Sequence, residues 1–149
     1  MGRKGADMTM LSQLLDAKGS NVYSVSPDAS VLDAIGLMAE RHIGAVVVME
    51  GARLAGILSE RDYARKVVLK GRSSTSTAVH EIMSTPVITV SPAQTVEDAM
   101  RLMTTHRIRH LPVVRDGAVT GIVSIGDLVK SVIEEQRHTI EDLKNYIQG

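Results

Sequence analysis

Apolar and polar positions along the chain follow one pattern that occurs twice. Residues 22–68 and 87–133 align without a gap at a constant offset of 65 residues, and 16 of the 47 aligned pairs are identical. Each copy opens with a short β-rich run, at 22–25 or 87–90, that Ser-Pro ends. Two copies of so long a period indicate a duplication rather than a solenoid, which needs about three or more stacked repeats. We therefore expect two related halves around a pseudo-two-fold axis.

A helix is predicted after each Ser-Pro. Ser30 and Thr95 each open a Ser/Thr-x-x-Asp sequence, in which the hydroxyl group can cap backbone N–H groups at the start of a helix. Apolar residues then recur at helical spacing, to about His42 in the first copy and Arg107 in the second. We expect the two helices to end near those residues.

Two strands and a second helix complete each copy. Apolar runs at 45–49 and 54–58 flank a Gly-containing turn and predict a hairpin, as do the corresponding runs of the second copy. The second helix is expected to start at Ser59 or Ser124 and, in the second copy, to continue to about Ile147. The order β-α-β-β-α, repeated, predicts an α/β (α+β) fold with helices packed on sheets.

The repeats also define the predicted domain organisation. Residues 8–70 form the first repeat, 71–78 a polar linker rich in Gly, Ser and Thr, and 79–149 the second repeat with a long C-terminal helix. Segments 11–15 and 79–83 correspond in placement and predict a short helical lead-in to each repeat. The end of the last helix has no counterpart in the first copy, which is typical of a helix used for association.

Composition excludes several classes of function. The formal charge is zero and the chain has three Tyr, no Phe and no Trp, so neither electrostatic attraction nor base stacking favours nucleic acid as a partner. The absence of Cys excludes disulfides and thiolate metal sites. The chain has neither a signal-peptide pattern nor an apolar run of about 20 residues, so we expect a cytoplasmic protein and no membrane span.

No catalytic or metal-binding constellation stands out. The sequence lacks the Gly-x-Ser-x-Gly elbow, the Walker phosphate loop and His-Glu-x-x-His. His106 and His110 are four residues apart, but a helix that ends near Arg107 does not place them on one face. We therefore predict that the protein is not an enzyme and has no metal site.

The best-matched junction of the repeats is Gly-x-x-Ser-x-x-Asp, at Gly56-Ile-Leu-Ser59-Glu-Arg-Asp62 and at Gly121-Ile-Val-Ser124-Ile-Gly-Asp127. In one interpretation, Ser and Asp only cap the helix that follows. In the other, the helix N-terminus binds an anion while the Asp carboxylate accepts hydrogen bonds from the two hydroxyl groups of a ribose. The two interpretations are compatible, since a capping residue can also face a ligand.

With Val-Ser-Pro at the start of each copy and His110-Leu-Pro-Val-Val in the second, these junctions make the chain resemble a tandem pair of CBS domains, or Bateman module, of the stand-alone bacterial type. The resemblance implies a regulatory or sensor homodimer that acts on an unknown downstream protein. It also implies that clefts between the repeats bind an adenosine-containing ligand such as AMP, ADP, ATP or NAD(H), with no catalytic cofactor. A structural or protein-interaction module with empty clefts is the alternative.

The resemblance further implies which residues bind the nucleotide. The first site would use Ser24, Val25, Ala45, Ser59 and Asp62, and the second Ile88, Thr89, His110, Pro112, Ser124 and Asp127. Among the basic residues of the two copies, Arg61 and Arg109 are the candidates for binding phosphate. The copies differ most where Gly44-Ala45 is replaced by Arg109-His110. We therefore expect the two sites to prefer different ligands or phosphate counts.

Overall fold

The computed structural model describes residues 9–148, which fall into two compact units. Unit 2 is the continuous segment Val22–Ile88. Unit 1 combines the described residues before it, 9–21, with those after it, 89–148. The predicted outer limits at residues 8 and 149 lie outside the described part of the chain.

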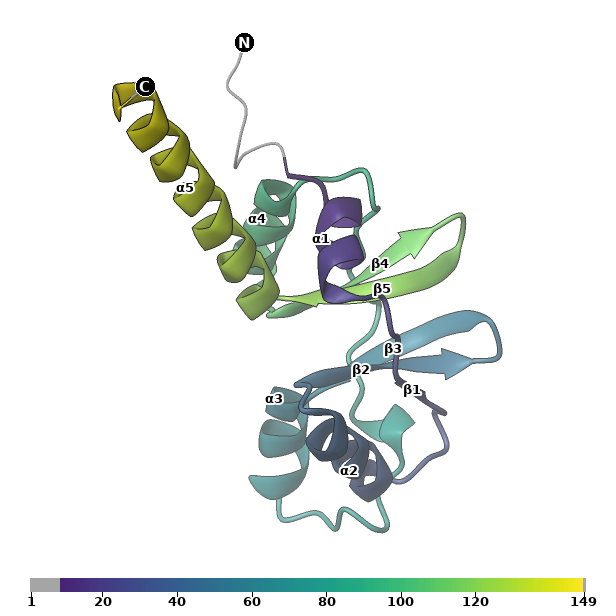
Figure 1. The fold of residues 1–149 in the computed structure, drawn as a ribbon. Helices are drawn as coiled ribbons and strands as arrows, with labels where there is room; N and C mark the ends of the chain where they lie inside the picture. The colour runs from purple at the N-terminus through teal and green to yellow at the C-terminus, as the bar shows by residue number, and fades with distance from the viewer. Residues whose placement is uncertain (1–8, 149) are drawn as a thin grey trace. The chain divides into compact units, whose positions relative to one another are not determined.

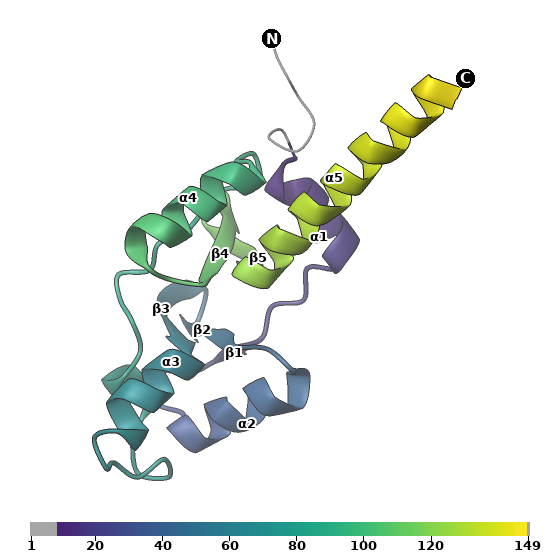
Figure 2. The same cartoon turned by 90° about the vertical axis from the view of Figure 1, so that its left-hand side faces the viewer.

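Unit 2 is a three-stranded sheet with α2 and α3 on one face (Figures 1 and 2). The sheet order is β1-β2-β3, in which β1 and β2 are parallel and β2 and β3 antiparallel. The elements are β1 (Ser24–Val25), α2 (Val31–Arg41), β2 (Ala45–Glu50), β3 (Arg53–Ser59), α3 (Glu60–Tyr63), the π-helical turn η2 (Ala64–Val68) and the 3-10 turn η3 (Val79–Glu81).

Unit 1 repeats this plan around an antiparallel hairpin, β4–β5 (Figure 1). Its elements are α1 (Leu11–Lys18), α4 (Val96–His106), β4 (His110–Arg115), β5 (Ala118–Ser124) and α5 (Ile125–Gln148). The predicted α+β fold with a long C-terminal helix is confirmed.

The predicted helix limits agree with the structure. The Ser30 hydroxyl accepts a hydrogen bond from Asp33 N at 3.0 Å, and Thr95 caps α4 in the same way. His42 and Arg107 follow the last helical residues and both adopt a left-handed conformation with φ of 56°. This conformation ends a helix, so the corresponding helices of the two copies stop at corresponding residues.

The prediction of a strand at 87–90, at the start of the second copy, is wrong. Only an isolated parallel bridge joins Val90 to Val113, with Val90 N donating to Pro112 O at 3.0 Å. In unit 2 the corresponding ladder includes a hydrogen bond from Val47 N to Tyr23 O. Pro112 occupies the position of Val47 and has no N–H group, so the second copy cannot make that bond.

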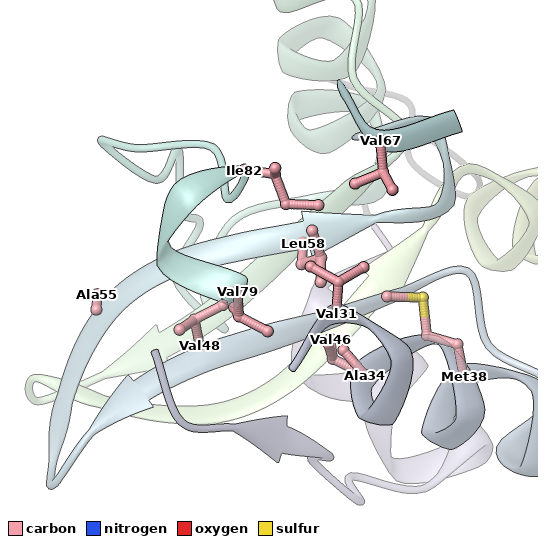
Figure 3. Packing of buried hydrophobic residues seen from close by; sticks show 10 residues of the cluster. All are labelled: Val31, Ala34, Met38, Val46, Val48, Ala55, Leu58, Val67, Val79 and Ile82. Carbon is pink, nitrogen blue, oxygen red and sulfur yellow. The ribbon is translucent and has the colours of Figure 1, made fainter. Parts of the chain in front are cut away.

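The two lead-in segments contribute to the cores of the units. In unit 2, Val79 and Ile82 of the second lead-in belong to the same buried cluster as the side chains of the first repeat (Figure 3). In unit 1, Leu11, Leu14 and Leu15 of α1 are buried. Each lead-in therefore belongs to the unit that holds the other repeat, a partition that differs from the predicted division at residues 70 and 79.

Hydrogen bonds attach the polar segment 71–78 to the start of α2. Leu32 N donates to Ser74 O at 3.0 Å, and Val31 N donates to Thr77 O at 2.9 Å. Thr77 is buried, and its hydroxyl group donates to Ser73 O at 2.6 Å. These bonds satisfy two N–H groups of the first helical turn that have no partner within the helix.

Candidate functional site

Both Gly-x-x-Ser-x-x-Asp sequences form a strand-to-helix junction closed by reciprocal hydrogen bonds. Asp62 N donates to Ser59 Oγ at 3.1 Å, while Ser59 N donates to Asp62 Oδ2 at 3.0 Å. In unit 1, Asp127 N donates to Ser124 Oγ at 3.1 Å, and Ser124 N donates to Asp127 Oδ2 at 2.8 Å. This is the capping box, so the capping interpretation of the motif is confirmed.

In unit 2, both oxygens of the Asp62 carboxylate are engaged. Oδ2 accepts from the backbone N and, at 3.1 Å, the hydroxyl group of Ser59. Oδ1 accepts from the Ser84 hydroxyl at 3.1 Å and pairs with Lys66 Nζ at 3.2 Å. Since a carboxylate offers about four acceptor positions, the contacts within unit 2 satisfy Asp62 completely.

In unit 1, the Asp127 carboxylate is engaged on one oxygen. Oδ2 accepts from Ser124 N at 2.8 Å and from Lys18 Nζ at 2.5 Å, whereas Oδ1 accepts no hydrogen bond from the described residues of this unit. Burial by itself raises the pKa of Asp127, but the hydrogen bonds from Lys18 and Ser124 and the Lys18 charge outweigh it and lower the pKa below its ordinary value. Asp127 is therefore held as a carboxylate, and within unit 1 the hydrogen bonds from Ser124 N and Lys18 Nζ both lie on Oδ2.

The motif glycines allow close approach of the lead-in segments. A Cβ on Gly56 would lie 2.5 Å from the Met83 sulfur and 3.1 Å from the Ser84 carbonyl oxygen. A Cβ on Gly121 would lie 2.8 Å from Leu15 Cδ1. A larger residue would clash with the Met83 side chain at Gly56 and with the Leu15 side chain at Gly121, which explains Gly at both positions.

In each unit a lysine also bonds the repeat to the lead-in. The lysine belongs to the repeat in unit 2 and to the lead-in helix in unit 1. In unit 2, Lys66 of the motif helix donates to the carbonyl of Ile82 in the lead-in, at 3.0 Å. In unit 1, Lys18 of the lead-in helix donates to the carbonyl of Ile122 in the motif strand, at 2.7 Å. Both lysines also pair with the motif Asp, so each junction joins a repeat to a lead-in segment.

The strand register gathers some predicted binding residues beside each junction. Ala45 pairs with Ser59 in unit 2, and His110 pairs with Ser124 in unit 1. Ile125 N also donates to Arg109 O at 2.9 Å, which fixes the backbone of Arg109 at the first helical turn.

The other predicted residues lie on neighbouring elements. Arg61 is in the first turn of α3, Ser24 and Val25 form β1, and Pro112 is in β4. Ile88 ends unit 2 and Thr89 begins the second part of unit 1. Contact of these residues with a ligand stays a prediction.

Lys18 and Ser84 contact the motif carboxylates but were not predicted from the sequence. Each lies 22 or more positions from its Asp, so no local pattern connects them. The only available signal was the matching placement of segments 11–15 and 79–83. Among residues 9–148, no helix is long and apolar enough to cross a membrane, and no three His, Asp or Glu side chains are grouped to hold a metal ion.

Comparison with known proteins identifies the repeats. The CBS-domain family model matches residues 16–69 and 79–134. The mitochondrial CBS domain-containing protein CBSX3 of Arabidopsis thaliana is 42% identical over 158 aligned residues, which cover 100% of this chain and 77% of that protein. YhcV of Bacillus subtilis, also a CBS domain-containing protein, is 38% identical over 79% of this chain and 84% of its own length.

Solved structures agree with this match. The structure of a protein with CBS domains from Burkholderia ambifaria MC40-6 superposes with a TM-score of 0.83 at 53% identity, over 86% of this chain and 96% of that one. The CBS-domain structure of NE2398 gives a TM-score of 0.81 at 46% identity, over 84% and 98% of the two chains. The chain thus belongs to the CBS-domain family and carries two CBS domains in tandem.

Proposed function

We propose that this CBS-domain pair is a sensor that binds an adenosine-containing nucleotide, such as AMP, ADP, ATP or NAD(H), and changes its conformation or association when it does. Pairs of this family are regulatory modules rather than enzymes. A ligand shifts such a module only by its difference in affinity for the two states. The proposal includes a homodimer that acts on a downstream protein, and a cytoplasmic location remains a prediction from the sequence.

The ligand class is supported by a structural neighbour and by the chemistry of the junction. The CBS-domain pair of MJ0100, which is 23% identical to this chain, was solved in complex with 5′-methylthioadenosine and S-adenosyl-L-methionine. Both ligands of that protein carry a ribose with two adjacent hydroxyl groups, which are donors that a carboxylate can accept. The junctions of this chain present such a carboxylate beside the first turn of a helix, where anions are favoured.

The observation that carries the proposal is the difference between the two carboxylates. Asp127 is held ionised, and its side chain is 24% exposed, with Oδ1 not engaged within unit 1. Asp62 is 12% exposed and its two oxygens already accept four contacts. A ribose can bind Asp127 through Oδ1, whereas at Asp62 it must first displace Ser84 or Lys66. We therefore assign the stronger binding to the junction of unit 1.

Thermal unfolding in the presence of AMP, ADP, ATP, NAD, NADH and S-adenosylmethionine tests the proposal. A ligand at 100 times its dissociation constant adds about 2.7 kcal/mol to the free energy of unfolding if it binds only the folded protein. We expect at least one of these compounds to raise the melting temperature. If none does, the protein is the structural or protein-interaction module that the sequence left as the alternative.

Asp127→Asn tests the assigned carboxylate. The substitution removes the charge that strengthens the hydrogen bonds to the ribose, so we expect the affinity to fall roughly tenfold, about 1.4 kcal/mol, by calorimetry.

Asp98→Asn is the matched control for Asp127→Asn. Asp98 caps α4 through a hydrogen bond from Thr95 N at 3.0 Å, so its substitution also weakens a capping box in unit 1. We expect Asp98→Asn to leave nucleotide affinity unchanged. Equal affinity in the two variants would leave Asp127 with a capping role alone.

A further inference from the structure

Helix α5 carries a row of apolar side chains that are exposed in the described chain. Val129, Ile133, Ile140, Leu143 and Ile147 are between 42% and 75% exposed, and Tyr146 is 85% exposed. From residue 136 to residue 147 every side chain is exposed. Figures 1 and 2 show this part of α5 extending away from α1 and α4 of the same unit.

A helical extension of this kind is not expected to be stable alone. Isolated helices shorter than about 12–15 residues are marginal in water, and most helical stability in proteins comes from packing of an apolar face. The uncovered part of α5 is of that length and has no packing within its unit. A partner for its apolar face would supply the missing stabilisation.

The apolar row has the spacing of a coiled-coil heptad. With Ile133, Ile140 and Ile147 at position a, position d is occupied by Val129, Gln136 and Leu143. Ile at a with Leu at d favours parallel two-stranded coiled coils, and one polar residue in such a seam fixes register and strand number. The seam therefore has both the apolar types and the single polar layer of a parallel dimer.

We propose that α5 pairs with α5 of a second copy of this chain, as a parallel, in-register, two-stranded coiled coil over residues 129–147. In this arrangement each residue of the seam meets the same residue of the partner copy. Gln136 then faces a second Gln136, and each side-chain amide has the donor and the acceptor that the other needs. A second copy is the partner that satisfies every layer at once.

The charges beside the seam favour the parallel orientation. Position e is basic throughout, at Lys130, Arg137 and Lys144. In a parallel pair these residues face position g of the partner, which carries the uncharged Val132 and Thr139. In an antiparallel pair the e positions would face one another, and like charges would repel. The acidic residues of this stretch lie at b and c, away from the seam: Glu134, Glu135, Glu141 and Asp142.

Single cysteines in the Cys-free chain test the pairing directly. Ile133→Cys and Ile147→Cys, prepared separately, each place one thiol in the seam. A parallel dimer brings the two copies of that thiol together, at an effective concentration in the millimolar range, so mild oxidation of the micromolar protein should cross-link it roughly a hundredfold faster than unpaired thiols. The controls are His138→Cys and Asn145→Cys at position f, on the face opposite the seam.

Cross-linking of both a-position variants well above the controls supports the proposal. Rates equal to those of the controls overturn it. The apolar face of α5 would then bind a different protein or no protein. An antiparallel pair also overturns it, and then Ile133→Cys cross-links in mixture with Ile147→Cys but not with itself, since these positions are about 21 Å apart along a helix.

A disruptive substitution provides a second measurement. Ile140→Lys places a charge in the seam at a side chain that is exposed within the unit, so the fold should stay intact. Combined with Ile147→Cys, it should reduce the cross-linking rate to that of the controls, and unchanged cross-linking would contradict the seam. The homodimer is part of the proposed function, and α5 is the surface through which it would form. It is tested without nucleotide, so either can fail while the other stands.

Discussion

The carboxylates of Asp62 and Asp127 each join three parts of a unit. Each closes a capping box, so it fixes the direction in which the motif helix leaves the strand. Each also pairs with a lysine, and the ammonium group of that lysine donates to a backbone carbonyl, which joins the repeat to the lead-in. Lys66 reaches Asp62 from four residues further along the chain, in η2, whereas Lys18 reaches Asp127 from 109 positions away in sequence. Breaking the second pair therefore loosens a long-range connection.

Lys18→Met should lower the stability of unit 1 in a pH-dependent way. The pKa of Asp127 is lowered in the folded protein, so its ionised form contributes stability above the ordinary Asp pKa and loses it as the pH falls through the lowered value. Met keeps the apolar stem but removes the ammonium group. Because Lys18 is 36% exposed, we expect a cost of only about 1 kcal/mol at pH 7. The cost should shrink as the pH falls from the ordinary Asp pKa, about 4, through the lowered pKa of Asp127.

Urea unfolding of the wild type and of Lys18→Met at pH 7, 5 and 3 measures this dependence. Lys70→Met serves as the control because Lys70 is an exposed lysine of unit 2, where substitutions usually stay within about 0.5 kcal/mol. A difference for Lys18→Met that is the same at all three pH values would mean that lost packing, and not the ion pair, causes it.

At the scale of elements, each motif strand has a glycine against which a side chain of the lead-in segment packs. Leu15 of α1 lies over Gly121 of β5, and Met83 lies over Gly56 of β3. The sequence predicted both glycines as part of the motif and both lead-ins as short helices. It could not predict that they touch, because the contact depends on which repeat each lead-in joins.

Gly121→Ala should destabilise the protein through Leu15. The new Cβ would lie 2.8 Å and 2.9 Å from the two Leu15 methyl carbons, so the buried Leu15 side chain must move, at a cost of about 1–3 kcal/mol. Leu15→Ala alone leaves a cavity and should cost about 2–5 kcal/mol. The double variant should cost less than the sum of the two, by about 0.5–3 kcal/mol, because the smaller side chain makes room for the new methyl group.

Denaturant unfolding of the four proteins in this cycle measures the coupling. Gly36→Ala is the control, since a Cβ at that position of α2 meets nothing within 4 Å and should stabilise the helix by about 0.5–1 kcal/mol. Strictly additive costs for Gly121→Ala and Leu15→Ala would show that the new Cβ is accommodated by something other than movement of the Leu15 side chain.

At the scale of the whole molecule, the sequence predicted element types better than their grouping. Periodicity and capping residues placed the helices and hairpins closely, because those signals are local. The strand at 87–90 failed for a tertiary reason, since Pro112 of another strand withholds a hydrogen bond. The Ser-x-x-Asp junctions were found, but Lys18 and Ser84 were not, because the lead-ins are exchanged between the repeats.

This exchange predicts which fragments of the chain fold alone. The segment 22–88 contains the whole core cluster of unit 2, including Val79 and Ile82, which are 0% and 1% exposed. A fragment cut at the repeat boundary, 8–70, lacks both side chains. Their burial contributes about 1.5–3 kcal/mol each, a large share of the 5–15 kcal/mol that stabilises a typical domain. We expect 22–88 to unfold cooperatively in urea and 8–70 to be largely unfolded.

The second half of the chain offers the matched comparison. Fragments 79–149 and 89–149 both lack α1, whose Leu11, Leu14 and Leu15 are buried in unit 1, so neither should fold stably. A peptide of residues 9–21 added in trans should restore cooperative unfolding to 89–149, and the same peptide with Leu15→Ala should restore it less. If instead 8–70 and 79–149 fold as well as 22–88, the repeats are the folding domains. The lead-ins would then be accessory contacts on units that are already stable.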